Sequence, residues 1–168
     1  MNKTIAAIQF IEDRHKGQRR KSSGLPYIVH LFSVYATVKE YKQSKNLDEL
    51  SAICLLHDSL EDTGTTKQEL LEIFGPIVAD TVEELTNDIE EINRIGKRAY
   101  IDQKLLKLSN YALTVKLADM LSNITDNPTF STLERTHHHI SFLKANRPAL
   151  TESQQKIIQH IETYFGGL

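Results

Sequence analysis

The chain has 168 residues and a mass of 19.2 kDa, which suits one globular domain with its own hydrophobic core. Twenty Lys and Arg residues against twenty-two Asp and Glu residues leave a formal charge of −2, which excludes a protein that binds polyanions through its overall charge. The single cysteine, Cys54, excludes an internal disulfide, and no apolar stretch approaches the roughly 18 residues of a membrane span. We therefore expect a cytoplasmic protein without a membrane or nucleic-acid partner.

Helical periodicity runs through most of the chain. Apolar residues recur every three or four positions, and no alternating β pattern is repeated with hairpin turns. The segment 14–26 is rich in Gly, Ser and basic residues and is predicted as a loop. The sequence predicts an all-α bundle of roughly eight to ten helices that forms one domain over residues 1–168. In chain order the helices are predicted near 5–11, 27–41, 47–61, 66–74, 77–85, 89–108 (charged and largely exposed), 110–124, 133–145 and 151–165.

The most informative segment is 52–62, in which an apolar run ends in His57-Asp58 and is followed by Glu61-Asp62. Residues four apart share one face of a helix, so His57 is predicted beside Glu61, and Asp58 beside Asp62. Carboxylates this dense repel one another, and a divalent cation is a common remedy. The alternative is a solvated helix end with a histidine satisfied by a carbonyl group, and this segment alone leaves both open.

Two other segments place polar residues on apolar helices. Lys116, Asp119 and Asn123 share one face of the helix predicted over 110–124, and His30 lies on an apolar turn just after the basic loop. Each residue by itself is typical of a surface or structural position. Two nitrogens and two carboxylate oxygens would be available together from His30, His57, Asp58 and Asp119.

A histidine, a His-Asp pair and a distant aspartate in this order resemble the HD phosphohydrolases. Three longer blocks resemble the RelA/SpoT hydrolase domain more specifically: HKGQRRKSSGLPYIVH at 15–30, LHDSLEDT at 56–63, and VKLAD at 115–119 with Asn123. The resemblance covers about residues 4–126. A chain of 168 residues has no room for the synthetase and regulatory domains of the long members. It is therefore most similar to the stand-alone small alarmone hydrolases, such as the metazoan SpoT homologues.

The resemblance implies one bound divalent ion, usually Mn²⁺ in this family. Imidazole and carboxylate ligands without a thiolate suit that ion. Its implied ligands are His30, His57, Asp58 and Asp119. The family's acidic pair, which orients and deprotonates the attacking water, corresponds to Glu61 and Asp62.

The same resemblance implies a small-molecule nucleotide as substrate. Arg20 and Lys21 match a basic pair that meets the nucleotide, with the arginine stacking on the purine. Asn123 matches a polar residue that lines the site, and Lys97 and Arg98 stand near where family members hold phosphate-binding residues. Without the resemblance, the basic run in 14–21 would be interpreted as a solvated loop.

The implied reaction is hydrolysis of the 3′-pyrophosphate of guanosine tetra- or pentaphosphate (ppGpp or pppGpp) to GDP or GTP and pyrophosphate. Alternatives are an HD phosphohydrolase that acts on an adenosine 3′-pyrophosphate or on the 2′-phosphate of NADPH, and a catalytically silent nucleotide sensor. Leu31 stands where the family commonly has proline, a departure that removes no metal ligand. Met120 stands where a basic residue is usual, which leaves substrate identity open. The oligomeric state is not predicted.

The tract His137-His138-His139 is a further candidate for metal binding. Adjacent residues on a helix point about 100° apart, so all three cannot ligate one ion. The tract is predicted as a surface or packing feature.

Overall fold

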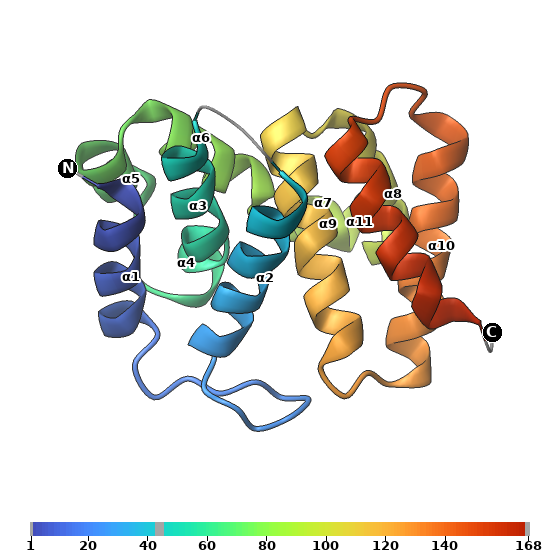
Figure 1. Ribbon diagram of the computed structural model, residues 1–168, viewed down its shortest axis with the longest axis horizontal. Helices are drawn as coiled ribbons and strands as arrows, with labels where there is room; N and C mark the ends of the chain where they lie inside the picture. The colour runs from blue at the N-terminus through green and yellow to red at the C-terminus, as the bar shows by residue number, and fades with distance from the viewer. Residues whose placement is uncertain (1, 43–45, 167–168) are drawn as a thin grey trace.

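The computed structural model describes residues 2–42 and 46–166 (Figure 1). Within these ranges the chain forms eleven α-helices and a final 3₁₀ turn, and no β-strand beyond an isolated bridge between Arg19 and Pro26. The prediction of an all-α fold is confirmed. The helices are α1 (Lys3–Arg14), α2 (Ile28–Tyr41), α3 (Leu47–Leu56), α4 (Ser59–Asp62), α5 (Lys67–Phe74), α6 (Pro76–Leu85), α7 (Ile89–Ile95), α8 (Lys97–Lys107), α9 (Asn110–Thr125), α10 (Phe130–Asn146) and α11 (Glu152–Glu162). The 3₁₀ turn covers Thr163–Phe165.

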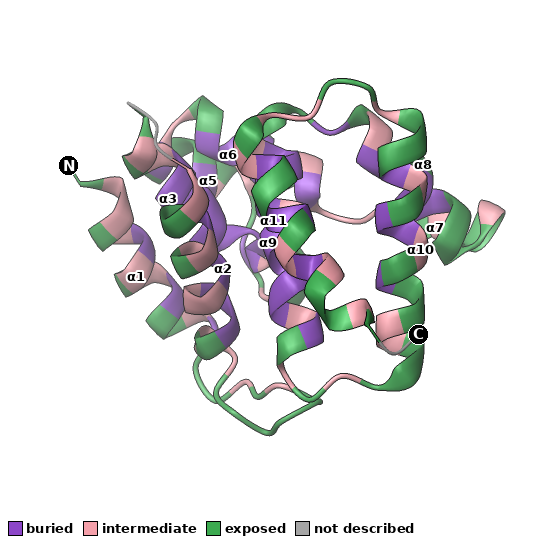
Figure 2. Cartoon of the chain, turned by 45° about the vertical axis from the view of Figure 1, so that its right-hand side comes forward, coloured by how far each residue is buried: buried purple, intermediate pink, exposed green. Residues whose placement is uncertain are grey.

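Helix α9 lies at the centre of the bundle. It packs against α2 on one side and against α10 and α11 on the other, and it is buried along most of its length (Figure 2). A helix that is covered on all sides is expected to be apolar all round. Helix α9 nevertheless buries three polar residues. Thr114 donates its hydroxyl to the Asn110 carbonyl of the same helix, whereas Asp119 and Ser122 are candidates for a site.

The predicted continuous helix over 47–61 is wrong, because α3 ends at Leu56 and α4 begins at Ser59. His57 follows α3 and Asp58 precedes α4, so the His-Asp pair lies at a break between two helices. The predicted stacking of His57 on Glu61 is wrong for the same reason. The Glu61 carboxylate instead accepts a hydrogen bond from the backbone N of Asn87 at 2.5 Å.

The predicted helix over 89–108 is also divided. Gly96 separates α7 from α8 and has φ 86°, a left-handed conformation that glycine adopts without steric cost. The prediction that this region is largely exposed holds for α7, which buries no residue. It is wrong for α8, which buries Tyr100, Ile101 and Leu105. These two breaks raise the number of α-helices from the nine predicted by range to the eleven found in the described residues.

The α1–α2 loop and the α9–α10 turn lie at the same end of the bundle (Figure 1). Ser22 Oγ donates to Asp126 Oδ2 at 2.6 Å, and Asn127 Nδ2 donates to the Ser22 carbonyl at 3.0 Å. The basic loop is thus tied to the end of α9. Among the described residues, no helix has both the length and the apolar character needed to cross a membrane.

Candidate functional site

Two buried histidines face each other next to α9. His30 comes from the first turn of α2 and His57 from the end of α3, and their ring centroids are 5.2 Å apart. His57 Nδ1 donates to the Cys54 carbonyl at 2.8 Å, and His30 Nδ1 is hydrogen-bonded to Ser122 Oγ at 2.9 Å. With both Nδ1 atoms occupied, the Nε2 atoms are left to face the carboxylates beside them.

Two carboxylates lie opposite these Nε2 atoms. Asp58 Oδ2 is 3.0 Å from His57 Nε2 and 3.5 Å from His30 Nε2, while Asp119 Oδ1 lies 4.0 Å and 3.3 Å from the same atoms. His57 Nε2 is buried without a geometrically satisfactory hydrogen bond. The ligand atoms of His30, His57 and Asp119 all lie within 4.8 Å of one another. Imidazole nitrogens and carboxylate oxygens around an unsatisfied buried nitrogen form a donor set that fits a divalent cation.

The electrostatics of the cluster keep its carboxylates charged. Burial by itself would raise the pKa of Asp58, but His57 and His30 hold that pKa well below its usual range. Burial would likewise raise the pKa of Asp119, and Lys116 and His30 lower it instead. Burial would lower the pKa of His57, but Asp58 and Asp119 outweigh it and raise the pKa to about 9. Both carboxylates are therefore ionised at neutral pH, as a cation site requires.

Three further side chains hold the carboxylates in place. Tyr27 donates its hydroxyl to Asp58 Oδ2 at 2.7 Å, while Lys116 Nζ and Asn123 Nδ2 donate to the two oxygens of Asp119 at 2.7 Å each. The i, i+3 spacing of Lys116 and Asp119 indicated their contact in advance. The roles of Tyr27 and Ser122 were missed, because a hydroxyl that bonds a residue on another helix leaves no periodic signal.

The acidic pair lies at the exposed edge of this cluster, and its two members differ. Both Glu61 oxygens face Asn87, whose backbone N and Nδ2 lie 2.5 Å and 3.3 Å away. Asp62 instead lines a cavity of about 510 Å³. The predicted residues Arg20, Lys21 and Asn123 line the same cavity, whose walls are Gln18, Arg19, Arg20, Lys21, Ser22, Tyr27, Asp62 and Asn123.

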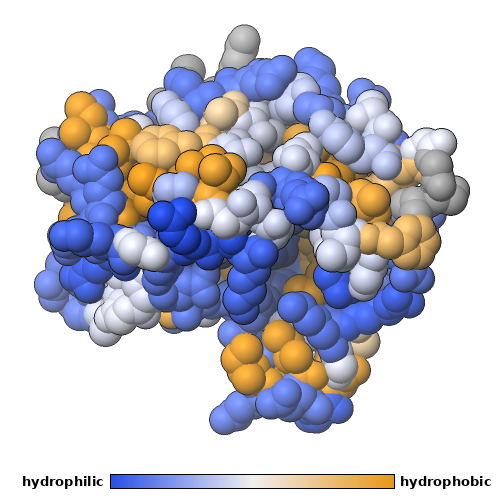
Figure 3. Space-filling view, turned by 90° about the horizontal axis from the view of Figure 1, so that it is seen from below, coloured by the Kyte–Doolittle hydropathy of each residue, from blue (hydrophilic) through white to orange (hydrophobic). Residues whose placement is uncertain are grey.

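A second cavity of about 470 Å³ adjoins the first and shares Arg20, Ser22 and Asn123 with it. Lys97 and Arg98 line it together with Asp119, so the structure brings both predicted basic residues to the cluster. In the view of the lower face in Figure 3, hydrophilic side chains surround a hollow. Arg135 on this cavity was missed in the sequence, and His139 was considered only as part of the histidine tract; their i, i+4 spacing on α10 was the available signal.

Arg20 is held by protein contacts. Its Nε donates to Asp126 Oδ2 at 2.8 Å and its Nη2 to Asn123 Oδ1 at 3.0 Å. These hydrogen bonds lie in the guanidinium plane, and the Arg20 side chain, which is 10% exposed, lines the cavity. Its stacking on a base stays a prediction.

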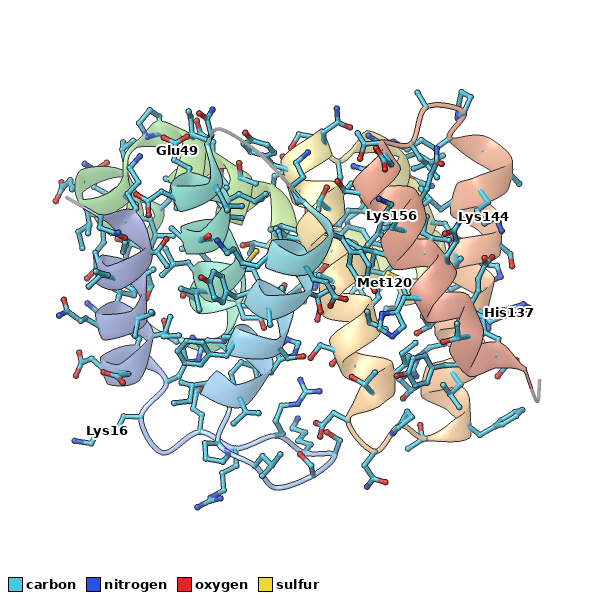
Figure 4. The ribbon with its side chains drawn as sticks, viewed as in Figure 1. Lys16, Glu49, Met120, His137, Lys144 and Lys156 are labelled. Atoms are coloured by element: carbon cyan, nitrogen blue, oxygen red, sulfur yellow. The ribbon has the colours of Figure 1, made fainter. Side chains whose placement is uncertain are left out.

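The two departures from the family pattern lie in different environments. Leu31 is fully buried in the core. Met120, labelled in Figure 4, lines the second cavity together with Arg135 and His139 of α10. Only Met120 therefore faces a space that a ligand could enter.

A family model described as HD domain matches residues 7–139. The chain belongs to the HD-domain family. A relative of this HD domain from Drosophila melanogaster, guanosine-3′,5′-bis(diphosphate) 3′-pyrophosphohydrolase MESH1, is 31% identical over 147 residues, covering 84% of this chain and 81% of the relative. GTP pyrophosphokinase rsh of Brucella melitensis is 37% identical over 125 residues, covering 70% of this chain but 16% of the longer protein. This HD domain thus spans about a sixth of that relative.

A solved structure described as a metazoan orthologue of SpoT that hydrolyses ppGpp has the same fold. It superposes on this HD domain with a TM-score of 0.79 at 26% identity, covering 100% of this chain and 98% of the other.

Proposed function

We propose that this HD domain hydrolyses the 3′-pyrophosphate of ppGpp or pppGpp, and that residues 1–168 act as one catalytic domain. The observation that carries the proposal is the cluster of two histidines and two aspartates beside a cavity lined by the basic loop. The similarity to proteins named as ppGpp hydrolases supports the same substrate.

We further propose that one divalent ion, Mn²⁺, is held by His30, His57, Asp58 and Asp119. The unsatisfied buried Nε2 of His57 and the absence of a thiolate from the cluster support this choice. Such an ion lowers the pKa of a water ligand and polarises a phosphoryl oxygen. Tyr27 and Lys116 keep the two carboxylates oriented towards the histidines.

The two acidic residues have different roles in this proposal. Asp62 takes the proton of the attacking water, because this residue lines the cavity. Glu61 holds Asn87 in place at the edge of the site, because its carboxylate is already hydrogen-bonded to that residue. The water oxygen bonds to phosphorus, the bond from phosphorus to the ribose 3′ oxygen breaks, and that oxygen takes a proton. The products are GDP or GTP and pyrophosphate.

The substrate carries phosphates on both sides of its ribose, and the two joined cavities suit such a molecule. Arg20, Lys21 and Asn123 bind the nucleotide in the first cavity, and Lys97 and Arg98 pair with phosphates in the second. The four cationic side chains among these five residues supply the local positive field that the net charge of −2 lacks.

A side-by-side assay tests the proposal. Protein supplied with Mn²⁺ would be incubated with ppGpp, with the adenosine compound that bears the same 3′-pyrophosphate, and with NADPH. We expect pyrophosphate release to be fastest from ppGpp. Faster release from the adenosine compound, or phosphate release from NADPH alone, would contradict the proposed base and substrate. Binding of ppGpp without any release would favour a nucleotide sensor.

A further inference from the structure

We propose that Asp102, His138 and His139 form a second cation site, which takes Zn²⁺ or a metal ion of similar ligand preference. The site joins α8 to α10 and is separate from the cluster around His57. The proposal does not rest on the proposed hydrolase activity.

The three side chains converge on one point. His138 Nε2 lies 2.8 Å from Asp102 Oδ2, and His139 Nδ1 lies 2.7 Å from Asp102 Oδ1. All three ligand atoms lie within 4.8 Å of one another, and the two rings are 5.3 Å apart at 74°.

Adjacent histidines reach one carboxylate here because they use different ring nitrogens. His138 presents the distal Nε2, and His139 presents Nδ1, which is nearer its backbone. The difference in reach compensates for the angle of about 100° between neighbouring residues on a helix. The sequence argument that three adjacent histidines cannot share an ion therefore still permits two of them to do so. His137 contacts Phe165 instead, with 5.0 Å between ring centroids.

Two of the three residues are buried, and the third is partly exposed to solvent. Asp102 and His139 are 8% and 7% exposed, whereas the His138 side chain is 35% exposed and leaves a way in. A buried carboxylate needs a positive partner or several donors. Without a metal, two imidazole N–H groups meet that need. When a metal ion binds, each neutral imidazole ring carries its proton on the other nitrogen, so that the nitrogen facing Asp102 is free to ligate the ion.

Two imidazole nitrogens and one carboxylate oxygen form the ligand set of a zinc site with one open position. Metal–ligand bonds of about 2.0 Å in a tetrahedral arrangement separate the ligand atoms by roughly 3.3 Å. The present separations of 2.7 Å and 2.8 Å therefore have to widen slightly at the contact between α8 and α10.

The surroundings set the relative affinity of this site. His139 lines the cavity of about 470 Å³ together with Lys97, Arg98 and Arg135. These positive charges oppose a free cation, and the site has one carboxylate where the His57 cluster has two. The site at Asp102 should consequently bind its ion more weakly than the His57 cluster does.

Calorimetric titration of the metal-free full-length protein with Zn²⁺ tests the proposal. We expect about two bound ions per chain in the wild type, and about one in Asp102→Asn and in His138→Gln. His137→Gln is the matched control, because His137 belongs to the same tract, lies on the outer side of α10 in Figure 4 and has its ring against Phe165. It should retain both ions. His57→Ala should lose the tighter ion and retain the second.

Circular dichroism of each variant separates loss of metal from loss of fold. His138→Gln changes a half-buried side chain and should remain folded even if Asp102→Asn does not. A wild type that binds about one ion, with that ion lost in His57→Ala, would overturn the proposal. So would a folded His138→Gln protein that still binds two, or a His137→Gln protein that loses one.

Discussion

Arg20 donates a hydrogen bond to Asn123 Oδ1 at 3.0 Å, although 103 positions separate the two residues in the chain. The amide of Asn123 also donates to Asp119 Oδ1 at 2.7 Å. One side chain therefore connects the basic loop with a carboxylate of the proposed metal-binding cluster. Loop position and cluster geometry should respond together to any change at Asn123.

Asn123→Ala removes both hydrogen bonds and leaves charged groups on either side. A hydrogen bond to a charged group contributes about 1.5–3 kcal/mol, so kcat/KM for ppGpp should fall roughly 10- to 100-fold. Steady-state kinetics would measure this. Asn146→Ala, which removes an exposed amide bonded to the Phe142 carbonyl on α10, is the control and should leave kcat/KM unchanged. Similar kinetics for the two variants would show that the connection through Asn123 is unimportant.

Asp58→Ala should abolish binding of the divalent ion and turnover together. The change removes the carboxylate nearest to His57 Nε2, at 3.0 Å, and the acceptor of the Tyr27 hydroxyl. Calorimetry would report the ion and pyrophosphate release the activity. Tyr27→Phe, which keeps the carboxylate and loses one hydrogen bond, should retain the ion with affinity weakened about 10- to 100-fold. Full turnover by Asp58→Ala would exclude Asp58 as a ligand.

The acidic pair can be separated by two isosteric variants. Asp62→Asn should bind metal and ppGpp normally and lose kcat by about 10²- to 10⁴-fold, because it cannot accept the proton. Glu61→Gln should also keep metal and substrate, with a smaller loss of rate, since an amide oxygen can still accept from Asn87 N. Unchanged turnover in both variants would remove the pair from the mechanism. A larger loss in Glu61→Gln would reverse the proposed roles.

Lys104 gives a prediction for pH. Its Nζ donates to the carbonyls of Leu85 and Thr86 at 2.7 Å and 2.6 Å, at the end of α6. Burial and the nearby Lys116 lower its pKa to about 8. Between about pH 8 and pH 10 the unfolded chain therefore binds more protons at this residue than the folded chain, and its contribution to stability rises with pH.

Unfolding by urea would measure this effect. The free energy of unfolding of the wild type should rise relative to that of Lys104→Met as pH increases from about 8 to about 10. Lys107→Met, at an exposed position on the same helix, should track the wild type. A constant difference between wild type and Lys104→Met across this range would contradict the lowered pKa.

Local patterns in the sequence predicted the helices well. Apolar periodicity predicted α2, α5, α6, α9 and α11 close to their bounds. The residues of the His57 cluster were also singled out in the sequence, because each lies in a short motif with its own spacing. Periodicity did not reveal the break at His57-Asp58, where neither glycine nor proline interrupts the pattern.

Contacts between distant segments account for what was missed. Glu61 with Asn87, Arg20 with Asp126, and Asp102 with two histidines on α10 are all polar pairs from different elements. Each partner by itself is an ordinary polar residue. Only the packing of α8 on α10, or of the basic loop on the end of α9, brings them together.

The most direct test of the central claim is pyrophosphate release from ppGpp by metal-stripped protein, measured before and after addition of Mn²⁺, for the wild type and for His57→Ala in parallel. We predict that the stripped wild type is inactive and recovers with Mn²⁺, whereas His57→Ala stays inactive at every Mn²⁺ concentration. Equal rates with and without the ion in the wild type, or recovery of His57→Ala, would contradict hydrolysis at the cluster of His30, His57, Asp58 and Asp119.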